Sequence, residues 1–462
     1  MTEQHPLLVD SHAHLDHSQF ATDCDEVISR ATADGISHIL SIGCDLASSE
    51  KNVALAEQYD HIYAAVGIHP HDAAGLDAAA LERLRELLQH PKVVALGEIG
   101  LDYFRDHCPQ DIQREAFRQQ IRLAKEAGKP IIVHDRDAHD EVLQILEEEQ
   151  AASVGGVLHC FSGDLAMARR CIELGFYLSF TGTITYPKNE EIRQVVSGIS
   201  IDRMLVETDC PYLSPQQFRG RRNEPAYVRL TAEKIAAIKG LTLEDVARIT
   251  SRNCYDLFGI GVIDQSHKIA YKIRDSLYLN ITNRCTNSCI FCTKFRDFIV
   301  KGHELKLDHE PSAEEVIAAI GDPKHYSEVV FCGYGEPLLR LELIKTIAAW
   351  LKKQGIKVRI NTDGQANLVY GRNILPELAG LIDSVSVSLN APDEATYQSL
   401  CQSSYGSKSY AAVKDFLRQA AQVIPEVTAS AVSYPGVDME ACSRVAQELG
   451  VDFRAREYNE VG

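Results

Sequence analysis

Histidine and carboxylate side chains, the usual protein ligands of divalent metal ions, follow short apolar runs in the first half of the sequence. His12 and His14 come after the run at residues 7–9. In an extended segment residues i and i+2 share a face, so both imidazoles can point at one ion. Nitrogen and oxygen donors together suit borderline divalent metals, and six of them suffice for two ions. The other ligand-type residues after such runs are Glu98, His134, His159 and Asp209.

Three cysteines stand close together in the second half. Cys285, Cys289 and Cys292 follow an apolar run at residues 277–282. Three close thiolates can bind three irons of a [4Fe–4S] cluster and leave the fourth iron open to another molecule. A zinc knuckle with a fourth ligand elsewhere, such as His303, is the alternative that this spacing leaves open.

The first half contains eight short apolar runs, rich in β-branched residues, that alternate with stretches of helical periodicity. This alternation predicts a parallel sheet buried on both faces, and eight units in about 260 residues predict a closed (β/α)8 barrel. Chemistry in such barrels sits at the C-terminal ends of the strands, where the six candidate ligands lie. The runs are 7–9, 36–42, 62–66, 93–96, 131–133, 157–158, 176–180 and 204–206.

Six further runs after residue 261 predict a second α/β unit, an open or partial (β/α)6 barrel. We therefore expect one domain over residues 1–261, a short linker over 262–271 and a second domain over 272–462. The second series of predicted strands is 277–282, 329–332, 358–361, 385–389, 427–432 and 451–453.

The composition limits the class of protein. The net charge is −18, and residues 1–263 carry 25 Lys and Arg against 40 Asp and Glu. Without a long basic tract, a protein that coats nucleic acid by charge alone is excluded. No apolar stretch is long enough to span a membrane. Thirteen cysteines, an odd number without a signal peptide, predict reduced thiols and a cytoplasmic location.

The first half resembles the TatD-type deoxyribonucleases, a family of metal-dependent hydrolases with a TIM-type (β/α)8 barrel. The resemblance implies that His12 and His14 bind one ion with Asp209, that Glu98 bridges, and that His134 and His159 hold a second ion. It also implies hydrolysis of DNA from the 3′ end with Mg, Mn or Zn, and Asp209 is our candidate general base. The matching segments are 10–16, 66–70, 97–103, 158–163, 207–213 and 219–225.

Four residues are candidates for contact with substrate phosphate. Guanidinium forks match phosphate oxygens, so a loop with three arginines within four residues can position a DNA backbone. Surface ion pairs are the alternative for the same loop. His69 is a candidate for phosphate contact or for orienting a metal ligand. The loop arginines are Arg219, Arg221 and Arg222.

The second half resembles the radical S-adenosylmethionine (radical SAM) superfamily, through the CxxxCxxC motif with Phe291 before its third cysteine and through the segment 332–337. The resemblance implies a six-stranded partial barrel in which a reduced [4Fe–4S] cluster cleaves S-adenosylmethionine, with an electron donor as partner. It assigns cofactor contacts to Gly333, Gly335 and Glu336. Further candidates for cofactor contact are Asn361, Ser386 and Ser388, which could equally cap the helices that follow.

Together these features predict a bifunctional α/β enzyme, a deoxyribonuclease fused to a radical SAM enzyme, with DNA as the substrate of the first half. The substrate of the second half and the oligomeric state are not predicted. Two alternatives remain open. The first half could hydrolyse another bond, such as an ester, amide or aminoacyl-tRNA bond, or one half could be a catalytically silent binding module.

Overall fold

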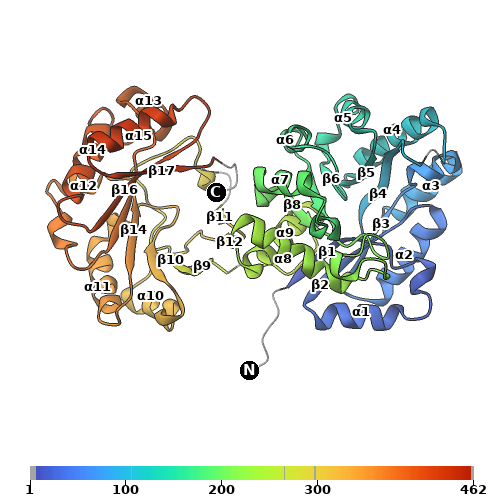
Figure 1. Cartoon of the computed structure of the whole chain (residues 1–462), viewed down its shortest axis with the longest axis horizontal. Helices are drawn as coiled ribbons and strands as arrows, with labels where there is room; N and C mark the ends of the chain where they lie inside the picture. The colour runs from blue at the N-terminus through green and yellow to red at the C-terminus, as the bar shows by residue number, and fades with distance from the viewer. Residues whose placement is uncertain (1–6, 106, 265, 296–297, 459–462) are drawn as a thin grey trace. The chain divides into compact units, whose positions relative to one another are not determined.

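The computed structural model describes residues 7–105, 107–264, 266–295 and 298–458. The chain divides into two compact units, Met1–Ile263 and Asp264–Gly462. The ends of the two predicted domains, residues 1–6 and 459–462, lie outside the described residues. Each unit is an α/β unit built around its own sheet (Figure 1).

The sheet of the first unit contains eight strands in chain order, all parallel. The ring closes between its first and last strands, because the Asp209 amide donates to His12 O (2.9 Å) and the His14 amide donates to Cys210 O (2.9 Å). The predicted closed barrel is confirmed. Its strands are β1 Leu8–Ala13, β2 Ile36–Ile42, β3 Ile62–Val66, β4 Val93–Asp102, β5 Ile131–Arg136, β6 Gly156–Leu158, β7 Tyr177–Phe180 and β8 Met204–Val206.

Strand β4 is longer than the sequence predicts. The predicted run ends at residue 96, but the strand continues to Asp102 and all ten of its residues are buried. Ile99 and Leu101 extend the apolar pattern past Glu98 and pair with β5, after a shift of register. Glu98 therefore lies inside a strand, at the irregularity between Leu96 and Ile99, and its amide donates to Gly43 O (3.1 Å).

Helices cover the outside of this barrel (Figure 1). Their apolar faces pack on outward-pointing strand residues and form the largest core cluster. A second cluster joins inward-pointing residues such as Leu40 and Ile132 with Cys254 and Phe258, so the last helix also packs against the barrel interior. The helices are α1 Cys24–Ala33, α2 Leu46–Gln58, α3 Ala78–Leu87, α4 Gln110–Ala127, α5 His139–Glu148, α6 Leu165–Glu173, α7 Glu190–Gly198, α8 Val228–Lys239 and α9 Leu243–Phe258.

The second unit contains an open sheet in which six parallel strands follow chain order and a seventh, β9, pairs antiparallel with β10. The six strands match the predicted partial barrel. The sheet runs over β9 Ala270–Ile273, β10 Ser276–Leu279, β13 Glu328–Phe331, β14 Val358–Thr362, β15 Ser384–Ser388, β16 Glu426–Val432 and β17 Asp452–Arg456, with a separate pair β11 Ile299–Val300 and β12 His303–Glu304.

The structure differs from the predicted linker, residues 262–271, at the C-terminal end of that range. Strand β9 begins at Ala270, and before it the Lys268 amide already donates to Glu304 O (2.8 Å). No local signal predicts this strand, because residues 270–273 form a short antiparallel edge strand without a continuous apolar run. An edge strand is buried on one side only, so it needs fewer apolar residues than a central parallel strand.

The helices of the second unit pack on its sheet and close a single apolar core. Sequence signals mark some of their starts: Ser312 and Glu315 form a capping box at the first turn of α10, in which each side chain accepts from the other residue's amide. The helices are α10 Ala313–Ile320, α11 Leu341–Lys352, α12 Ala366–Tyr370, α13 Glu394–Cys401, α14 Lys408–Ala420 and α15 Met439–Glu448.

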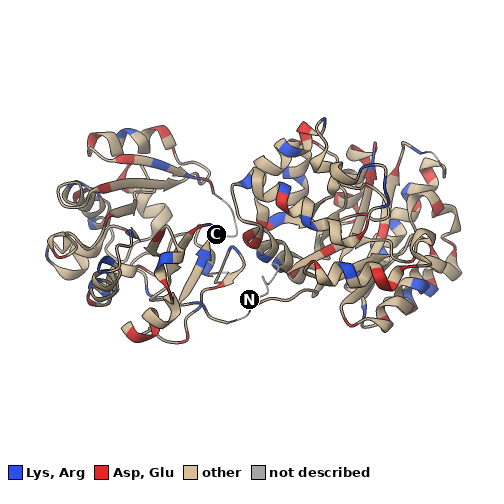
Figure 2. Cartoon of the chain, turned by 60° about the horizontal axis from the view of Figure 1, so that its bottom comes forward, with Lys and Arg blue, Asp and Glu red and all other residues tan. Residues whose placement is uncertain are grey.

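Charged residues of both signs are interspersed over the helices of both units (Figure 2). This agrees with the absence of a long basic tract in the sequence. Among the described residues, no helix has the length and apolar character that crossing a membrane requires.

Candidate metal centre and cluster site

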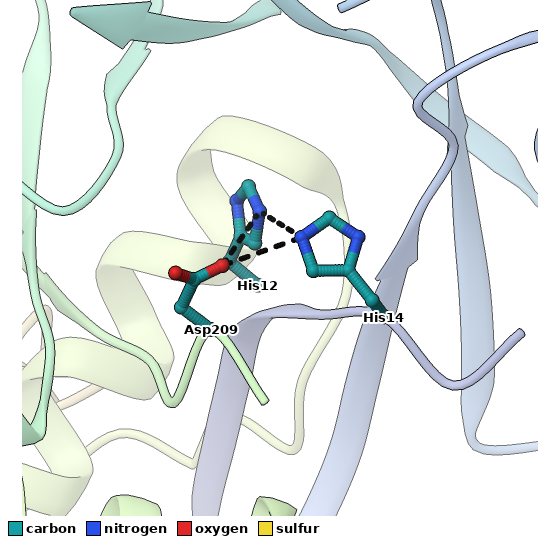
Figure 3. Close-up of side chains that lie close together, drawn as sticks. All are labelled: His12, His14 and Asp209. Atoms are coloured by element: carbon teal, nitrogen blue, oxygen red, sulfur yellow. Dashed lines mark hydrogen bonds and ion pairs between the residues drawn. The ribbon is translucent and has the colours of Figure 1, made fainter. Parts of the chain in front are cut away.

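Three of the predicted ligands meet where β1 and β8 end. His12 lies in β1, His14 follows that strand, and Asp209 follows β8. Asp209 Oδ1 lies 3.6 Å from His12 Nε2 and 3.3 Å from His14 Nε2, and the two imidazole nitrogens are 3.3 Å apart. Figure 3 shows the three side chains pointing toward one another. Their donor atoms all lie within 4.8 Å of one another, close enough to share one ion.

Glu98 connects this group with the remaining ligands. Its Oε2 lies 3.4 Å from His12 Nε2, while its Oε1 lies 2.6 Å from His134 Nδ1 and 2.7 Å from His159 Nε2. Burial acts to raise the pKa of Glu98, but the histidines around it outweigh burial and hold that pKa well below its usual range. One ionised carboxylate thus faces donors from β1, β5 and the end of β6.

The arrangement fits two divalent ions. The structure brings four imidazoles and two carboxylates from five strands to one end of the barrel. Four of these six residues are buried, and His134 and Asp209 are half-buried. The ion pairs of Glu98 and Asp209 in the described part of the chain are to histidines. Divalent ions would balance the two carboxylates and accept these mixed nitrogen and oxygen donors.

Hydrogen bonds behind the ligands orient the imidazoles. His14 Nδ1 lies 3.1 Å from Ile42 O, to which it donates, so Nε2 presents its lone pair to the site. His134 Nε2 lies 3.3 Å from Asp102 Oδ2, so Nδ1 is the nitrogen that faces Glu98. Sequence reasoning assigned no role to Asp102, although it belongs to the matching segment 97–103. The position of Asp102 behind His134 becomes clear only because β4 continues as far as Asp102.

Glu207 is a second residue that the sequence did not single out. It is fully buried, and its Oε1 lies 3.6 Å from His159 Nδ1. The Cys160 amide donates to Oε1 (2.6 Å) and the Ser179 hydroxyl donates to Oε2 (2.5 Å). The carboxylate is therefore fixed in place and supports His159 from the side away from Glu98.

His69 lies beside the candidate centre. Its Nε2 is 3.5 Å from Glu98 Oε1, and its Nδ1 accepts a hydrogen bond from the His71 amide (3.1 Å). Burial lowers the pKa of His69 to about 4, so the ring is neutral near pH 7. Because Nδ1 is an acceptor, the proton is on Nε2, and His69 can donate a hydrogen bond into the site.

The three loop arginines differ in their surroundings. Arg222 donates to both carboxylate oxygens of Asp23 (2.8 and 2.6 Å) and to Gln19 O (2.6 Å). Arg219 is exposed and stacks on the Tyr186 ring, 4.6 Å from its centroid. Arg221 is exposed as well. The structure thus gives Arg222 an intramolecular partner and leaves Arg219 and Arg221 as the better candidates for phosphate contact.

The cysteine segment of the second unit is anchored to the end of α13. The Ser288 amide donates to Cys401 O (3.0 Å), the Ile290 amide donates to Leu400 O (2.9 Å), and the Ser404 amide donates to Thr286 O (3.0 Å). Burial raises the pKa of Cys285 to about 12, so a cation must be near to hold it as a thiolate. Three half-buried thiols on one braced loop fit the irons of a cluster.

The alternative fourth ligand of a zinc knuckle is directed elsewhere. His303 lies in β12, and its Nε2 donates to Lys272 O (3.0 Å). The same ring packs at a tilt on Tyr271, 5.3 Å between centroids. These contacts keep His303 on the β9 side of the unit and favour the cluster over zinc.

The glycine segment after β13 fits closely against residues 280–284, which follow β10. A Cβ at Gly333 would lie 2.2 Å from Asn280 Oδ1, and a Cβ at Gly335 would lie 2.1 Å from Thr282 O, so only glycine allows this approach. Glu336 is buried, and its carboxylate accepts from Thr362 Oγ1 (2.8 Å) and from the amides of Leu338 and Asp363 (2.9 and 2.6 Å). The Glu336 side chain thus fixes the turn itself.

Two of the three further candidates for cofactor contact accept hydrogen bonds from arginines of the same unit. Asn361 Oδ1 accepts from Arg359 Nη1 (2.7 Å), and Ser388 Oγ accepts from Arg456 Nη2 (3.4 Å). Ser386 is half-buried in β15. The structure places all three at or near the C-terminal ends of β14 and β15, and sequence reasoning missed Arg456.

The fold and its ligand set define the first unit as a metal-dependent hydrolase barrel. The second unit is an open α/β barrel with a cysteine loop after its first parallel strand. Comparison with known proteins identifies the family that each unit matches. The family "TatD related DNase" matches residues 9–259, and the "Radical SAM superfamily" matches residues 279–449. The chain belongs to the TatD-related DNase family and carries a radical SAM domain, and both matches indicate an enzyme.

Individual relatives match the first unit along their whole length. The chain is 49% identical over 255 residues to the "uncharacterized metal-dependent hydrolase YabD" of Bacillus subtilis, covering 55% of this chain and 100% of that protein. It is 37% identical over 259 residues to the "3′-5′ ssDNA/RNA exonuclease TatD" of Escherichia fergusonii, covering 55% and 100%. The crystal structure of YJJV, a TatD homolog from Escherichia coli, matches with a TM-score of 0.53 and 32% identity, covering 55% and 98%.

Proposed function

We propose that the first unit is a divalent-metal-dependent exonuclease that removes nucleotides from the 3′ end of single-stranded DNA. The observation that carries this proposal is the convergence of four imidazoles and two carboxylates around Glu98 at one end of the barrel. These six residues would hold two divalent ions, which would supply an activated water molecule and stabilise the charge that develops on the phosphate. The exonuclease name of the Escherichia fergusonii relative supports the choice of substrate.

The residues of the site have separate roles in this proposal. The Asp209 side chain keeps 13% exposure, so water can reach it and transfer a proton to its carboxylate. His69 donates from Nε2 to a phosphate oxygen, and Glu98 is the buried anion that bridges the two ligand groups. Arg219 and Arg221 hold the DNA backbone on the exposed loop through their guanidinium groups.

The second unit, in the same proposal, cleaves S-adenosylmethionine reductively. Cys285, Cys289 and Cys292 would hold a [4Fe–4S] cluster, through which one electron from an external donor would cleave S-adenosylmethionine to methionine and a 5′-deoxyadenosyl radical. Gly333 and Gly335 allow the turn after β13 to lie close to residues 280–284, which lead from β10 into the cysteine loop. All thirteen cysteines are free thiols, which supports a reducing compartment such as the cytoplasm.

The nuclease is tested by incubating the full chain with 3′-labelled single-stranded DNA and Mg²⁺ or Mn²⁺. Samples with His12→Ala and with EDTA serve as controls, because both remove the bound ions. Release of mononucleotides by the wild type alone supports the proposal. Intact DNA in every sample, with metal bound to the wild type, would assign the six ligands to hydrolysis of another bond, such as an ester, amide or aminoacyl-tRNA bond.

A further inference from the structure

Tyr212 is an aromatic side chain exposed beside the candidate metal centre. It is 49% exposed, and the centroid of its ring lies 6.1 Å from that of His14, a predicted ligand, and 5.5 Å from that of His17. The planes of the rings are inclined by 70° and 72°, so neither histidine stacks parallel on the tyrosine. A large flat ring next to the ligands is thus left in contact with solvent.

The exposed aromatic side chains of the first unit are not scattered over its surface. Among the described residues of that unit, the exposed ones are Phe104 and Tyr212. Phe104 follows β4 and Tyr212 follows β8, so both lie at the end of the barrel that carries the predicted ligands. The Phe104 ring already has the Arg136 guanidinium over one face, 4.0 Å from its centroid, whereas Tyr212 lies directly against a ligand.

The backbone of Tyr212 is held in place although its side chain is exposed. The Tyr212 amide donates to Asp209 O (2.9 Å), and the Tyr212 carbonyl accepts from Asn223 Nδ2 (2.6 Å). Asn223 is fully buried, and its own amide donates to Pro211 O (3.1 Å). A ring presented from a fixed backbone can bind a ligand without the entropic cost of ordering a loop.

The same loop contains a candidate phosphate contact. The Ser214 hydroxyl donates to Arg221 O (2.5 Å), which brings the backbone of Arg221 close to the segment of Tyr212. One braced loop therefore carries a carboxylate of the metal centre, Asp209, an exposed ring and an exposed guanidinium. A nucleotide matches this set, because it has a phosphate for the cations and a base whose flat face can stack on the ring.

We propose that Tyr212 is a stacking platform for the base next to the phosphodiester bond that the metal centre hydrolyses. Stacking uses the face of a base and not its edge, so this contact accepts all four bases. A base inside a duplex has both faces covered by its neighbours, and the platform therefore favours the end of a single strand. This inference rests on the proposed nuclease function of the first unit and adds how the nucleotide is held there.

The test uses the full chain with Mn²⁺ and three 5′-labelled single-stranded oligonucleotides. One has all its bases, one carries a stable abasic analogue at its last position, and one carries it at its next-to-last position. Steady-state kinetics are measured for the wild type, Tyr212→Ala and Tyr212→Phe. Tyr59→Ala is the matched control, because Tyr59 lies between α2 and β3, at the opposite end of the barrel from the ligands. Melting curves of all four proteins show whether each one is folded.

We expect Tyr212→Ala to raise the KM for the complete oligonucleotide about tenfold, which is in the range that one stacked base contributes. Tyr212→Phe keeps the ring and should behave as the wild type does, and so should Tyr59→Ala. With one of the two abasic oligonucleotides, the wild type should show the same rise in KM, and Tyr212→Ala should add no further rise. Such coupling identifies the ring and that base as partners.

Three results would overturn the proposal. The first is an unchanged KM in Tyr212→Ala, and the second is a rise of equal size with all three oligonucleotides, since the ring would then not contact a base. The third is an equal rise in Tyr212→Phe, which would assign the effect to the hydroxyl group. A wild type that binds metal but cleaves no oligonucleotide is a different result, because it contradicts the proposed nuclease function and this inference with it.

Discussion

The two candidate centres of this chain are built in opposite ways. In the first unit, the six ligands span residues 12 to 209 and come from the ends of five strands, and only closure of the barrel brings them together. In the second unit, the three cysteines lie within one loop between residues 285 and 292. The first centre depends on the whole fold, whereas the second depends on a short segment that the fold braces.

This difference has a consequence for how each centre responds to change. A ligand of the distributed centre is fixed by the residues behind it, as Asp102 fixes His134 and Ile42 fixes His14. The cysteine loop is fixed by backbone hydrogen bonds to the end of α13. We therefore expect side-chain substitutions behind the ligands to matter in the first unit, and substitutions of the cysteines themselves to dominate in the second.

The largest effect is expected from Cys285→Ala. Removing one of three thiolates from the loop should abolish cluster binding and formation of 5′-deoxyadenosine while leaving nuclease activity unchanged. Iron and sulfide per chain, 5′-deoxyadenosine and mononucleotide release are measured on the same preparation. Cys442→Ala in α15 is the control and should load the cluster normally. A full cluster in Cys285→Ala, or a parallel loss of nuclease activity, would contradict the separation of the two centres.

Asp209→Asn should lower turnover of single-stranded DNA by about 10³-fold, because an amide cannot take the proton of the attacking water. DNA binding should change by less than about threefold, since the proposed role of Asp209 is toward the reacting water and not toward the rest of the strand. Single-turnover rates and fluorescence anisotropy measure the two quantities. Asp256→Asn, at an exposed residue of α9 paired with Arg252, is the control. Unchanged turnover in Asp209→Asn would exclude it as the base.

Asp102→Asn should reduce metal affinity or activity by roughly 10- to 100-fold, because the carboxylate that orients His134 is lost while all six ligands remain. Manganese titration followed by activity measurement separates weaker binding from slower turnover. Asp135→Asn, whose partner is the half-buried His139, is the matched control on β5. If Asp102→Asn behaved like that control, the distributed centre would not depend on the residues behind its ligands.

The smallest effects are expected on the arginine loop. Arg222→Gln should lower the free energy of unfolding only slightly, since its pair with Asp23 is partly exposed, and should leave the KM for DNA unchanged. Arg221→Gln should raise that KM several-fold without affecting stability. Urea unfolding and steady-state kinetics of both variants decide between these roles. If the KM rose equally in Arg222→Gln and Arg221→Gln, Arg222 would also be a phosphate-binding residue.

Most of both folds could be predicted from the sequence, because continuous apolar runs mark central parallel strands. Two features escaped prediction for the same reason. Strand β9 is an edge strand with a weak apolar pattern, and the second half of β4 contains Glu98, a charged residue inside a buried strand. Sequence periodicity reports burial, so it fails where a strand is half exposed or where a buried position carries a functional charge.

The amino-acid sequence by itself determined the types of both centres. The ligand residues, their places after apolar runs and the cysteine spacing are local properties, and chemistry limits which ions such residues can bind. Only the tertiary structure decided which side chains lie beside these residues: Asp102 behind His134, Glu207 behind His159, and Asp23 beside Arg222. These pairs join residues far apart in the chain, and their contacts depend on strand length, register and loop path, which no local pattern specifies.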